Sequence, residues 1–418
     1  MLDIGTEPTR PHFPAYSPFS PDQVNDPFPA LAKARRECPV FYSDELKMWV
    51  VTRYEDVNFI YANPSTFSNS SVLTPRTDMP PSIVAEFGGW APPISKMLVM
   101  TDAPQHTRLR QLMAKAFTPA RVSLFKPWIL QIENSLIDGF LEKKHGDLVE
   151  LFTSLVPTDV IARILGIPTE DARMFAKWVG DLNNLAGTFN ADEKSLIACW
   201  RGVREFEQYV MKLVASRRKE PREDVVSYFI EAKSEDGSPA MSDIEVLHNV
   251  ANVAAAGSET SGVLLAVTIY QLLRHPNQWQ DLKSNPGLIP GAIEESLRFG
   301  GVVRGLIRRT TQDTQVGGQQ ILEGEFVYFS LASANRDETV FVDGETFNIR
   351  RPNARRHFGL GGGIHNCLGA SLARLETTIG IQCLIDRMPN LALAKDHEDL
   401  QYRANIMIPP VHSLEVTW

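Results

Sequence analysis

A long apolar segment near the middle of the chain limits the possible folds more than any other feature. Residues 242–273 carry apolar side chains at three- and four-residue spacing and on most faces of the helix that this spacing predicts. A helix that is apolar around most of its circumference is buried. Its most apolar stretch is interrupted by Thr268, Tyr270 and Gln271, and is too short to span a bilayer. We therefore expect this helix to run through the interior of the protein.

The rest of the chain predicts a mainly helical α+β protein. Helical spacing continues from residue 105 to about residue 300, and short strands are expected at 307–311, 320–322 and 326–331. Because there is no internal repeat or flexible linker, residues 1–418 are interpreted as one domain with small peripheral sheets.

Two proline-rich segments are expected to lack regular structure. Residues 1–29 contain seven prolines and predict an extended N-terminal segment. Residues 68–104 contain six prolines, and an irregular segment of this length is typical of a binding loop or lid. We interpret it as a flexible substrate-access loop.

Charge and cysteine content exclude several classes of protein. The chain has 42 Lys and Arg against 50 Asp and Glu, which argues against a broad nucleic-acid interface. The cysteines Cys38, Cys199, Cys367 and Cys383 form no C-x-x-C pair, which excludes a cysteine zinc ribbon or a dithiol redox motif. Few cysteines and no apolar leader at Met1 predict a cytoplasmic protein with no membrane contact.

The segment 357–369, His-Phe-Gly-Leu-Gly-Gly-Gly-Ile-His-Asn-Cys-Leu-Gly, is the most informative motif. Its glycines allow close approach of the backbone to a flat or bulky ligand. Cys367 precedes a predicted helix, whose N-terminal amides would stabilise a thiolate, a strong ligand for iron. Two other interpretations are a buried structural cysteine and a phosphate loop, although the spaced third glycine of a phosphate loop is missing.

Polar residues also interrupt the predicted central helix. Glu259 and Thr260 lie side by side in Ala-Gly-Ser-Glu-Thr-Ser, and burying them is costly unless they have partners or a function. In the structural alternative, Thr260 bonds to the carbonyl one turn earlier and Glu259 forms a salt bridge. Glu295 and Arg298 share a helix face at i, i+3, as an ordinary surface ion pair would.

Together these motifs resemble those of the cytochrome P-450 family in its soluble bacterial form. The cysteine loop, the Ala-Gly-x-Glu-Thr segment, the Glu-x-x-Arg pair and Phe347-x-x-x-Arg351 occur in the family's order, and the resemblance extends from about residue 20 to the end. It implies a cytochrome P-450 fold with haem b. The implied reaction inserts one oxygen atom of O2 into a small, mostly apolar substrate. Electrons would come from NAD(P)H through a separate ferredoxin and ferredoxin reductase, and the protein is expected to be a monomer.

The resemblance also assigns roles to individual residues. It implies that Cys367 is the axial iron ligand, that Thr260 takes part in oxygen activation and that Glu259 relays protons. Leu360 occupies the position where the family usually has Phe, which removes the aromatic ring near the sulfur. The implied structural triad is Glu295, Arg298 and Arg351.

Further residues are expected around the haem and the substrate. The predicted haem contacts are His106, Arg110, Arg308, His365, Leu360, Gly361, Gly363 and Gly369, the first four of them with the propionates. The predicted substrate pocket comprises Ile94, Leu98, Val99, Asn252, Ala255, Ala256, Val303, Arg304, Leu306, Met407 and Ile408. Arg304 is expected either to turn toward solvent or a propionate, or to meet a polar group of the substrate. Candidates for ferredoxin docking are Arg108, Lys115, Arg355 and Arg356, for which free solvated side chains are the alternative.

Two other functions remain open for a protein of this kind. One is a non-catalytic haem-thiolate sensor or recruitment protein, and the other is a peroxygenase that uses hydrogen peroxide directly. Both would be expected to lack the acid–alcohol pair, so the presence of Glu259 and Thr260 favours the monooxygenase.

Overall fold

The computed structural model describes residues 10–418 apart from 71, 73–79, 89, 91, 93–95, 188–191, 235 and 395–398. Its helices are α1 (Pro21–Asn25), α2 (Phe28–Glu37), α3 (Tyr54–Ala62), α4 (Pro81–Phe87), α5 (Gln105–Ala114), α6 (Pro119–Ser123), α7 (Lys126–Phe140), α8 (Leu155–Ile164), α9 (Ala172–Gly187), α10 (Glu193–Lys219), α11 (Val225–Glu231), α12 (Asp243–Arg274), α13 (Pro276–Ser284), α14 (Ile289–Phe299), α15 (Leu331–Ala334) and α16 (Ala370–Arg387). The predicted predominance of helix is confirmed.

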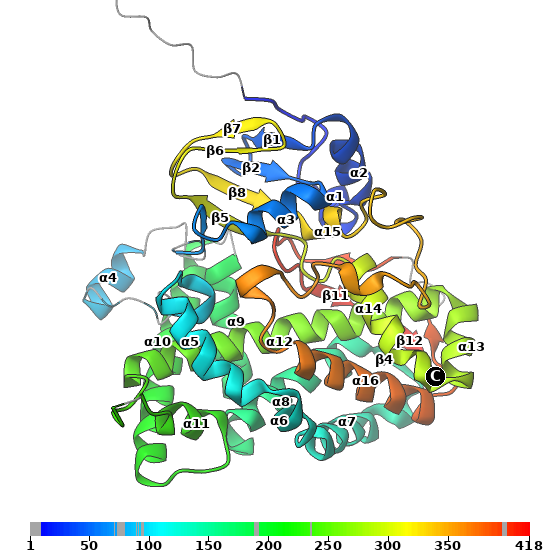
Figure 1. The fold of residues 1–418 in the computed structure, drawn as a ribbon. Helices are drawn as coiled ribbons and strands as arrows, with labels where there is room; N and C mark the ends of the chain where they lie inside the picture. The colour runs from blue at the N-terminus through cyan, green and yellow to red at the C-terminus, as the bar shows by residue number, and fades with distance from the viewer. Residues whose placement is uncertain are drawn as a thin grey trace, which may run out of the picture.

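The strands form small sheets at the periphery. They are β1 (Val40–Ser43), β2 (Met48–Val51), β3 (Phe67–Ser68), β4 (His145–Asp147), β5 (Leu306–Thr310), β6 (Thr314–Val316), β7 (Gln319–Ile321), β8 (Phe326–Phe329), β9 (Ala392–Leu393), β10 (Gln401–Tyr402), β11 (Val411–Ser413) and β12 (Glu415–Thr417). The largest sheet has the order β1-β2-β8-β5-β3, and β2 and β8 pair in parallel from Trp49 opposite Val327. Figure 1 shows this sheet above the helical body.

Helix α12 forms the centre of the helical body, as the sequence predicts (Figure 1). Ser242 and Glu245 form a capping box at its start, which satisfies two backbone N–H groups. Helices α8, α10, α14 and α16 pack against it. Among the described helices, α12 alone has the length and hydropathy of a membrane span, but most of it is buried inside the protein, as in a core helix.

Two expectations about the proline-rich segments are wrong. The N-terminal segment is not extended throughout, because α1 begins at Pro21 and Ser20 caps it. The access segment contains helix α4, which begins at Pro81. In both cases proline occupies the first helical position, where its missing N–H costs nothing and its fixed φ favours the helix.

Candidate active site

A mostly apolar cavity of about 260 Å³ lies between α12, the start of α16 and the loop before it. Cys367 and Thr260 both line it, although they are far apart in the sequence. Its other walls come from α5, α8, α14 and the segments around residues 98–99, 302–306 and 408. The cavity therefore brings together the cysteine loop and the polar segment of the central helix.

Cys367 is held at the cavity wall by the turn before α16. Its N–H donates to the Leu360 carbonyl at 2.8 Å, which closes the loop. The accessible surface of its side chain faces the cavity. Burial raises the pKa of the thiol, although the Gly369 N–H, Arg110 and Arg374 act to lower it. The Gly369 N–H at the start of α16 thus favours the thiolate, whereas burial of the sulfur opposes it. A metal ion at the sulfur would remove the proton by coordination.

The glycines of the loop are required by its backbone. Gly361 and Gly363 have φ of +73° and +58°, a region that favours glycine. A Cβ at Gly363 would lie 2.6 Å from the Tyr61 carbonyl oxygen, so no other side chain fits there. Gly361, Leu360 and Gly369 line the cavity, whereas Gly363 packs on Tyr61 outside it. The predicted direct ligand contact of Gly363 is therefore not supported.

The sulfur has no aromatic neighbour from this loop. Phe358 packs against Tyr54 and Tyr61, at ring-centroid distances of 4.5 and 5.4 Å, and belongs to the core beneath the five-stranded sheet. Leu360 lines the cavity beside Cys367. An aliphatic side chain therefore stands next to the sulfur at position 360, as predicted.

Four basic side chains lie close together, and two of them, Arg110 and His365, line the cavity. The rings of His106 and His365 lie 4.2 Å apart, and Arg110 and Arg308 both act electrostatically on His365. Burial, together with Arg308, His106 and Arg110, lowers the pKa of His365 to about 3. Burial lowers the pKa of Arg308 to about 10. The predicted propionate-binding residues are thus close together in space.

This basic cluster fits the carboxylates of a haem. No described Asp or Glu forms an ion pair with His106, Arg110, Arg308 or His365. The buried His106 Nε2 has no hydrogen-bond partner among the described residues, which is costly unless a ligand supplies one. Mutual repulsion within the cluster would be relieved by anionic groups. The donors present, together with the Cys367 thiol in the same cavity, match the group that the resemblance implies.

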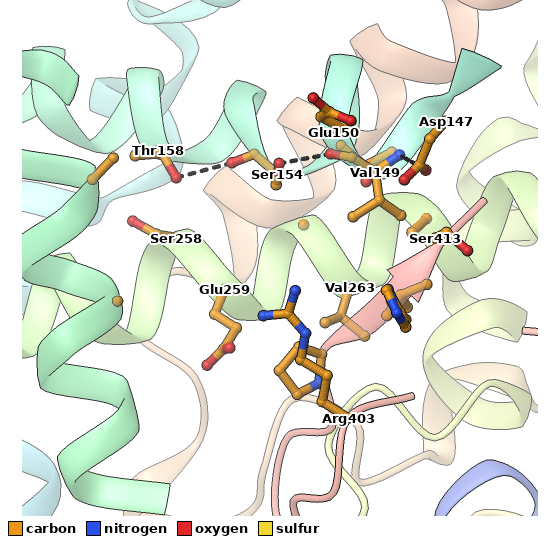
Figure 2. A pocket seen from close by; sticks show the side chains of 18 of the residues that line it. Asp147, Val149, Glu150, Ser154, Thr158, Ser258, Glu259, Val263, Arg403 and Ser413 are labelled. Carbon is orange, nitrogen blue, oxygen red and sulfur yellow. Dashed lines mark hydrogen bonds between the residues drawn. The ribbon is translucent and has the colours of Figure 1, made fainter. Parts of the chain in front are cut away.

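Glu259 and Thr260 face different spaces on the two sides of α12. Thr260 lines the cavity, and its hydroxyl donates to the Ala256 carbonyl at 2.6 Å. Glu259 lines a separate, solvent-open pocket of about 790 Å³ with Ser258 and Arg403 (Figure 2). The hydrogen bond of the structural alternative is present, but Glu259 forms no salt bridge with any described residue. The central helix thus separates an acid in contact with solvent from an alcohol in the cavity.

The surroundings of Glu259 suit proton exchange. Burial raises the pKa of its carboxyl to about 7, although the positive charge of Arg403 acts to lower it. Figure 2 shows the Glu259 carboxylate and the Arg403 guanidinium on the same side of α12. The acid is therefore present in both protonation states near neutral pH.

The structure supports most of the predicted substrate pocket and contradicts part of it. Predicted residues that line the cavity are Leu98, Val99, Asn252, Ala256, Val303, Leu306 and Ile408. Those that do not line it are Ala255, Arg304 and Met407, and Ile94 lies outside the described residues. Ala255 and Met407 instead pack in the hydrophobic core. The spacing of residues along a segment does not by itself determine which side chains point into the cavity.

Neither predicted position of Arg304 is correct. Its Nη1 donates to the Val24 carbonyl at 2.6 Å, and the guanidinium lies 4.7 Å from the centroid of the Tyr402 ring. The side chain is buried against the N-terminal segment, away from solvent and cavity. Backbone carbonyls and an aromatic face compensate its charge in place of a carboxylate.

Asn252 has a structural partner at the cavity edge. Its Oδ1 accepts from the Val99 N–H at 3.4 Å, and Asn249 Oδ1 accepts from the Leu98 N–H at 3.1 Å. Two asparagines of α12 thus hold the end of the access segment against the central helix. This contact gives the polar side chain of Asn252 a partner in a mostly apolar cavity.

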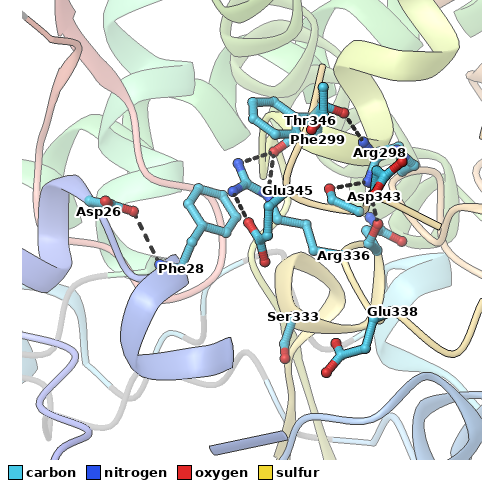
Figure 3. A network of polar contacts seen from close by, with 12 residues as sticks. Asp26, Phe28, Arg298, Phe299, Ser333, Arg336, Glu338, Asp343, Glu345 and Thr346 are labelled. Atoms are coloured by element: carbon cyan, nitrogen blue, oxygen red, sulfur yellow. Dashed lines mark hydrogen bonds and ion pairs between the residues drawn. The ribbon is translucent and has the colours of Figure 1, made fainter. Parts of the chain in front are cut away.

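The predicted triad is assembled in the core. Glu295 Oε1 lies 2.7 Å from Arg298 Nη2 and 3.0 Å from Arg351 Nε, and the side chains of Glu295 and Arg298 are fully buried. Arg298 also donates to the carbonyls of Asn335 and Gly344. Figure 3 shows the surrounding network, in which Arg336 contacts Glu345. The surface ion-pair alternative is therefore wrong, and these contacts fix the coil before the cysteine loop.

Several cavity residues were not predicted from the sequence. They include Phe117, Ile161, Ser261, Leu297 and Leu372. Ile161 reaches the cavity because α8 crosses α12 at Gly257, where a Cβ would lie 2.5 Å from Ile161 Cδ1. A glycine in the middle of a buried helix is the one sequence signal that could have indicated this crossing.

Comparisons with known proteins agree on one family. The family model described as Cytochrome P450 matches residues 83–411. Cytochrome P450 CYP107DY1 of Priestia megaterium is 36% identical over 88% of this chain and 89% of its own length. Nocardicin C N-oxygenase of Nocardia uniformis is 34% identical over 96% and 98%. The solved cytochrome P450 CREJ, in complex with (4-ethylphenyl) dihydrogen phosphate, superposes with a TM-score of 0.89, 31% identity and coverage of 96% and 99%.

Proposed function

The chain belongs to the cytochrome P450 family, a family of haem-thiolate monooxygenases, and from this premise we propose the reaction and the residues that carry it. The proposed reaction inserts one oxygen atom of O2 into a small, mostly apolar organic molecule. The observation that carries the proposal is the cavity in which a cysteine thiol and the Thr260 hydroxyl share one mostly apolar space. Such a cavity favours apolar substrates because few groups in it can bind charge.

In this proposal two groups of residues hold haem b. Cys367 ligates the iron, and His106, Arg110, Arg308 and His365 bind the propionates. When bound, the haem supplies the redox chemistry of O2 reduction and substrate oxidation. Phe117, Leu297 and Leu372 are apolar wall residues that exclude water from the same cavity.

Glu259 and Thr260 move protons in this scheme. Glu259 takes a proton from water in the open pocket, which Arg403 also lines. Its carboxyl, with a pKa of about 7, can both accept and release a proton near neutral pH. A proton that Glu259 releases would reach the Thr260 oxygen, and Thr260 would give up its own hydroxyl proton to the cavity. The alcohol also orients water, because its hydroxyl is fixed by the Ala256 carbonyl.

Electrons would reach the protein from NAD(P)H through ferredoxin reductase and a small acidic ferredoxin. Arg355 and Arg356 are exposed beside the coil that leads to the cysteine loop, and Lys115 is exposed after α5. Arg108 is a weaker candidate because it already bonds to Glu245 and to the Ala240 carbonyl. Positive side chains on an acidic protein would guide an acidic partner to this face.

A spectral screen tests the proposal. Terpenoids, steroids, fatty acids and aromatic acids are titrated into the haem-loaded protein, and a change of iron spin state identifies ligands. Product formation with NAD(P)H, ferredoxin and reductase is then compared with formation driven by hydrogen peroxide. Ferredoxin-driven hydroxylation is expected. Turnover with peroxide alone would favour a peroxygenase, and ligand binding without any turnover would favour a sensor.

A further inference from the structure

Asn252 of α12 is a buried polar side chain in the wall of the cavity. It is 7% exposed and lines the cavity together with Leu98 and Val99. Its Oδ1 accepts a hydrogen bond from the Val99 N–H at 3.4 Å, and this contact fixes which side of the amide is oxygen and which is nitrogen. Among the described residues, none accepts a hydrogen bond from Nδ2. The amide therefore has a committed acceptor and an unpaired donor.

Neighbouring side chains of α12 keep this part of the wall in place. Asn249 Oδ1 accepts from the Leu98 N–H at 3.1 Å, and His248 Nδ1 accepts from the Lys96 N–H at 2.9 Å. Burial and the charge of Lys96 lower the pKa of His248 to about 4, so its imidazole is neutral at pH 7 and can accept this hydrogen bond. The access segment is thus bound to α12 on both sides of these contacts, and the Asn252 amide has a defined orientation.

Other donors of the cavity have a partner or a proposed ligand. The Thr260 hydroxyl donates to the Ala256 carbonyl. Arg110 and His365 belong to the basic cluster that fits the haem carboxylates. The Asn252 amide belongs to neither group. An unpaired donor in a mostly apolar wall is unfavourable, and a ligand that brings an acceptor to it removes this cost.

The unpaired donor lies on the same face of α12 as the residue proposed for oxygen activation. Asn252, Ala256 and Thr260 follow one another at four-residue spacing, and all three line the cavity. Side chains at this spacing share one face of a helix. About two helical turns, or about 12 Å along the axis, separate the first from the last. A ligand that reaches both therefore carries its acceptor several bonds away from the atom next to Thr260.

We propose that the Asn252 amide donates a hydrogen bond to a neutral oxygen acceptor of the substrate, such as a carbonyl group, and so determines which carbon is oxidised. The inference rests on the proposed monooxygenase function and narrows its substrate class to apolar molecules that carry such an oxygen. A neutral acceptor is favoured over a carboxylate, because the amide has no charge and the Val24 carbonyl holds Arg304 away from the cavity. A hydrocarbon without an acceptor leaves the donor unpaired and binds less well.

A matched pair of ligands tests this selectivity on the haem-loaded protein. The pair is undecan-2-one and 2-methylundec-1-ene, in which a CH2 group replaces the carbonyl oxygen. The ratio of their dissociation constants, measured by titration, should shift against the ketone by about fivefold to tenfold in Asn252→Leu. The control Asn249→Leu also loses a contact with the access segment but does not line the cavity, so it should keep the wild-type ratio. An unchanged ratio in Asn252→Leu, or an equal shift in both variants, would overturn the proposal.

Infrared spectroscopy tests the hydrogen bond itself and needs no variant. The ketone is labelled with 13C at its carbonyl group and bound to the wild type. A hydrogen bond lowers the C=O stretching frequency below its value in an alkane solvent, and we expect this lowering in the wild type and in Asn249→Leu, but not in Asn252→Leu. A bound ketone that keeps its alkane frequency in the wild type would overturn the proposal, as would failure of the wild type to bind the ketone.

Turnover distinguishes this inference from the proposed function. With NAD(P)H, ferredoxin and reductase, the ketone should be oxidised toward the far end of its chain, and at more positions in Asn252→Leu. Oxidation only beside the carbonyl would contradict the distance between Asn252 and Thr260 along α12. Absence of any turnover, with the shift in affinity and the infrared shift as expected, would refute the monooxygenase function and support the ligand contact.

Discussion

Arg304 and Arg308 are four residues apart in the sequence but have different surroundings. The charge of Arg304 is stabilised by backbone carbonyls and the Tyr402 ring, whereas Arg308 belongs to the basic cluster at the cavity. The sequence predicts that both cationic side chains lie near the site, because their charge and their spacing from the motifs can be taken from the sequence. It does not predict the position of the N-terminal segment. The Val24 carbonyl of this segment accepts a hydrogen bond from Arg304, although the two residues are 280 positions apart in the sequence.

At the same scale, Thr260 gives a direct prediction. Thr260→Ala should uncouple the enzyme, because the cavity loses the hydroxyl that orients water and passes on protons. NAD(P)H consumption continues, more hydrogen peroxide is released and less product is formed, whereas Thr260→Ser retains coupling. The measurement is the ratio of product to NAD(P)H consumed. An unchanged ratio in the Ala variant would show that Thr260 is only a structural residue of α12.

The raised pKa of Glu259 predicts that coupled turnover decreases as the pH rises. Because the pKa of its carboxyl is raised to about 7, the protonated donor is lost as the pH rises above 7. Coupled turnover should therefore fall from pH 7 to pH 8. Glu259→Gln should lower turnover by roughly 10²-fold and remove this dependence. A Gln variant that keeps the same pH profile would assign the titration to another group.

The same shift affects stability. A carboxyl group whose pKa is higher in the folded state binds more protons there than in the unfolded chain. The contribution of Glu259 to the free energy of unfolding is therefore complete below its ordinary pKa of 4.5 and is lost as the pH rises to about 7. Glu376, with a pKa of about 8, extends this loss by one further pH unit.

At the scale of elements, side chains of α4 and of the residues after it contact α10. The Glu86 carboxylate on α4 binds Arg201 at 2.8 Å, and the Trp90 ring after α4 lies 5.8 Å from the Trp200 ring. Trp90 Nε1 also donates to Glu207, and Arg204 lies over the Trp90 ring. These contacts join the access segment to a helix that is far away in the sequence.

We expect substrate binding to slow hydrogen exchange in α4, and Trp90→Ala to speed it. The reason is that the aromatic contact with Trp200 is the most buried part of this attachment. Arg201→Ala should have a smaller effect, because solvent screens the exposed ion pair that it removes. Exchange measured by mass spectrometry with and without a spin-shifting ligand checks this. Equal exchange in the wild type and Trp90→Ala, with and without ligand, would contradict a role of α4 as a lid.

The elements differ in how far the sequence predicts them. Helix α12 is predicted because its apolar residues fill most faces over a long stretch. Helix α4 is not, because six prolines in residues 68–104 suggest irregular structure, although Pro81 is placed where a helix can begin. Cavity residues such as Ile161 come from helix crossings, which depend on tertiary packing and leave little trace in a single segment.

For the whole molecule, the buried triad joins the helical body to the coil before the cysteine loop. Glu295→Gln should lower the free energy of unfolding by about 3–5 kcal/mol, because Arg298 and Arg351 lose their buried partner. The matched control Arg350→Ala breaks the exposed ion pair with Asp281 and should cost under about 1 kcal/mol. Denaturant unfolding measures both. Equal losses would mean that burial does not distinguish the two ion pairs.

The central claim, that Cys367 ligates a haem in this cavity, is tested most directly by the spectrum of the reduced carbon monoxide complex. The wild type should give the spectrum of a thiolate-ligated haem. Cys38→Ser, which changes a cysteine remote from the cavity, should give the same spectrum, and Cys367→His should lose it while it retains bound haem. A thiolate-type spectrum that persists in Cys367→His would contradict the account.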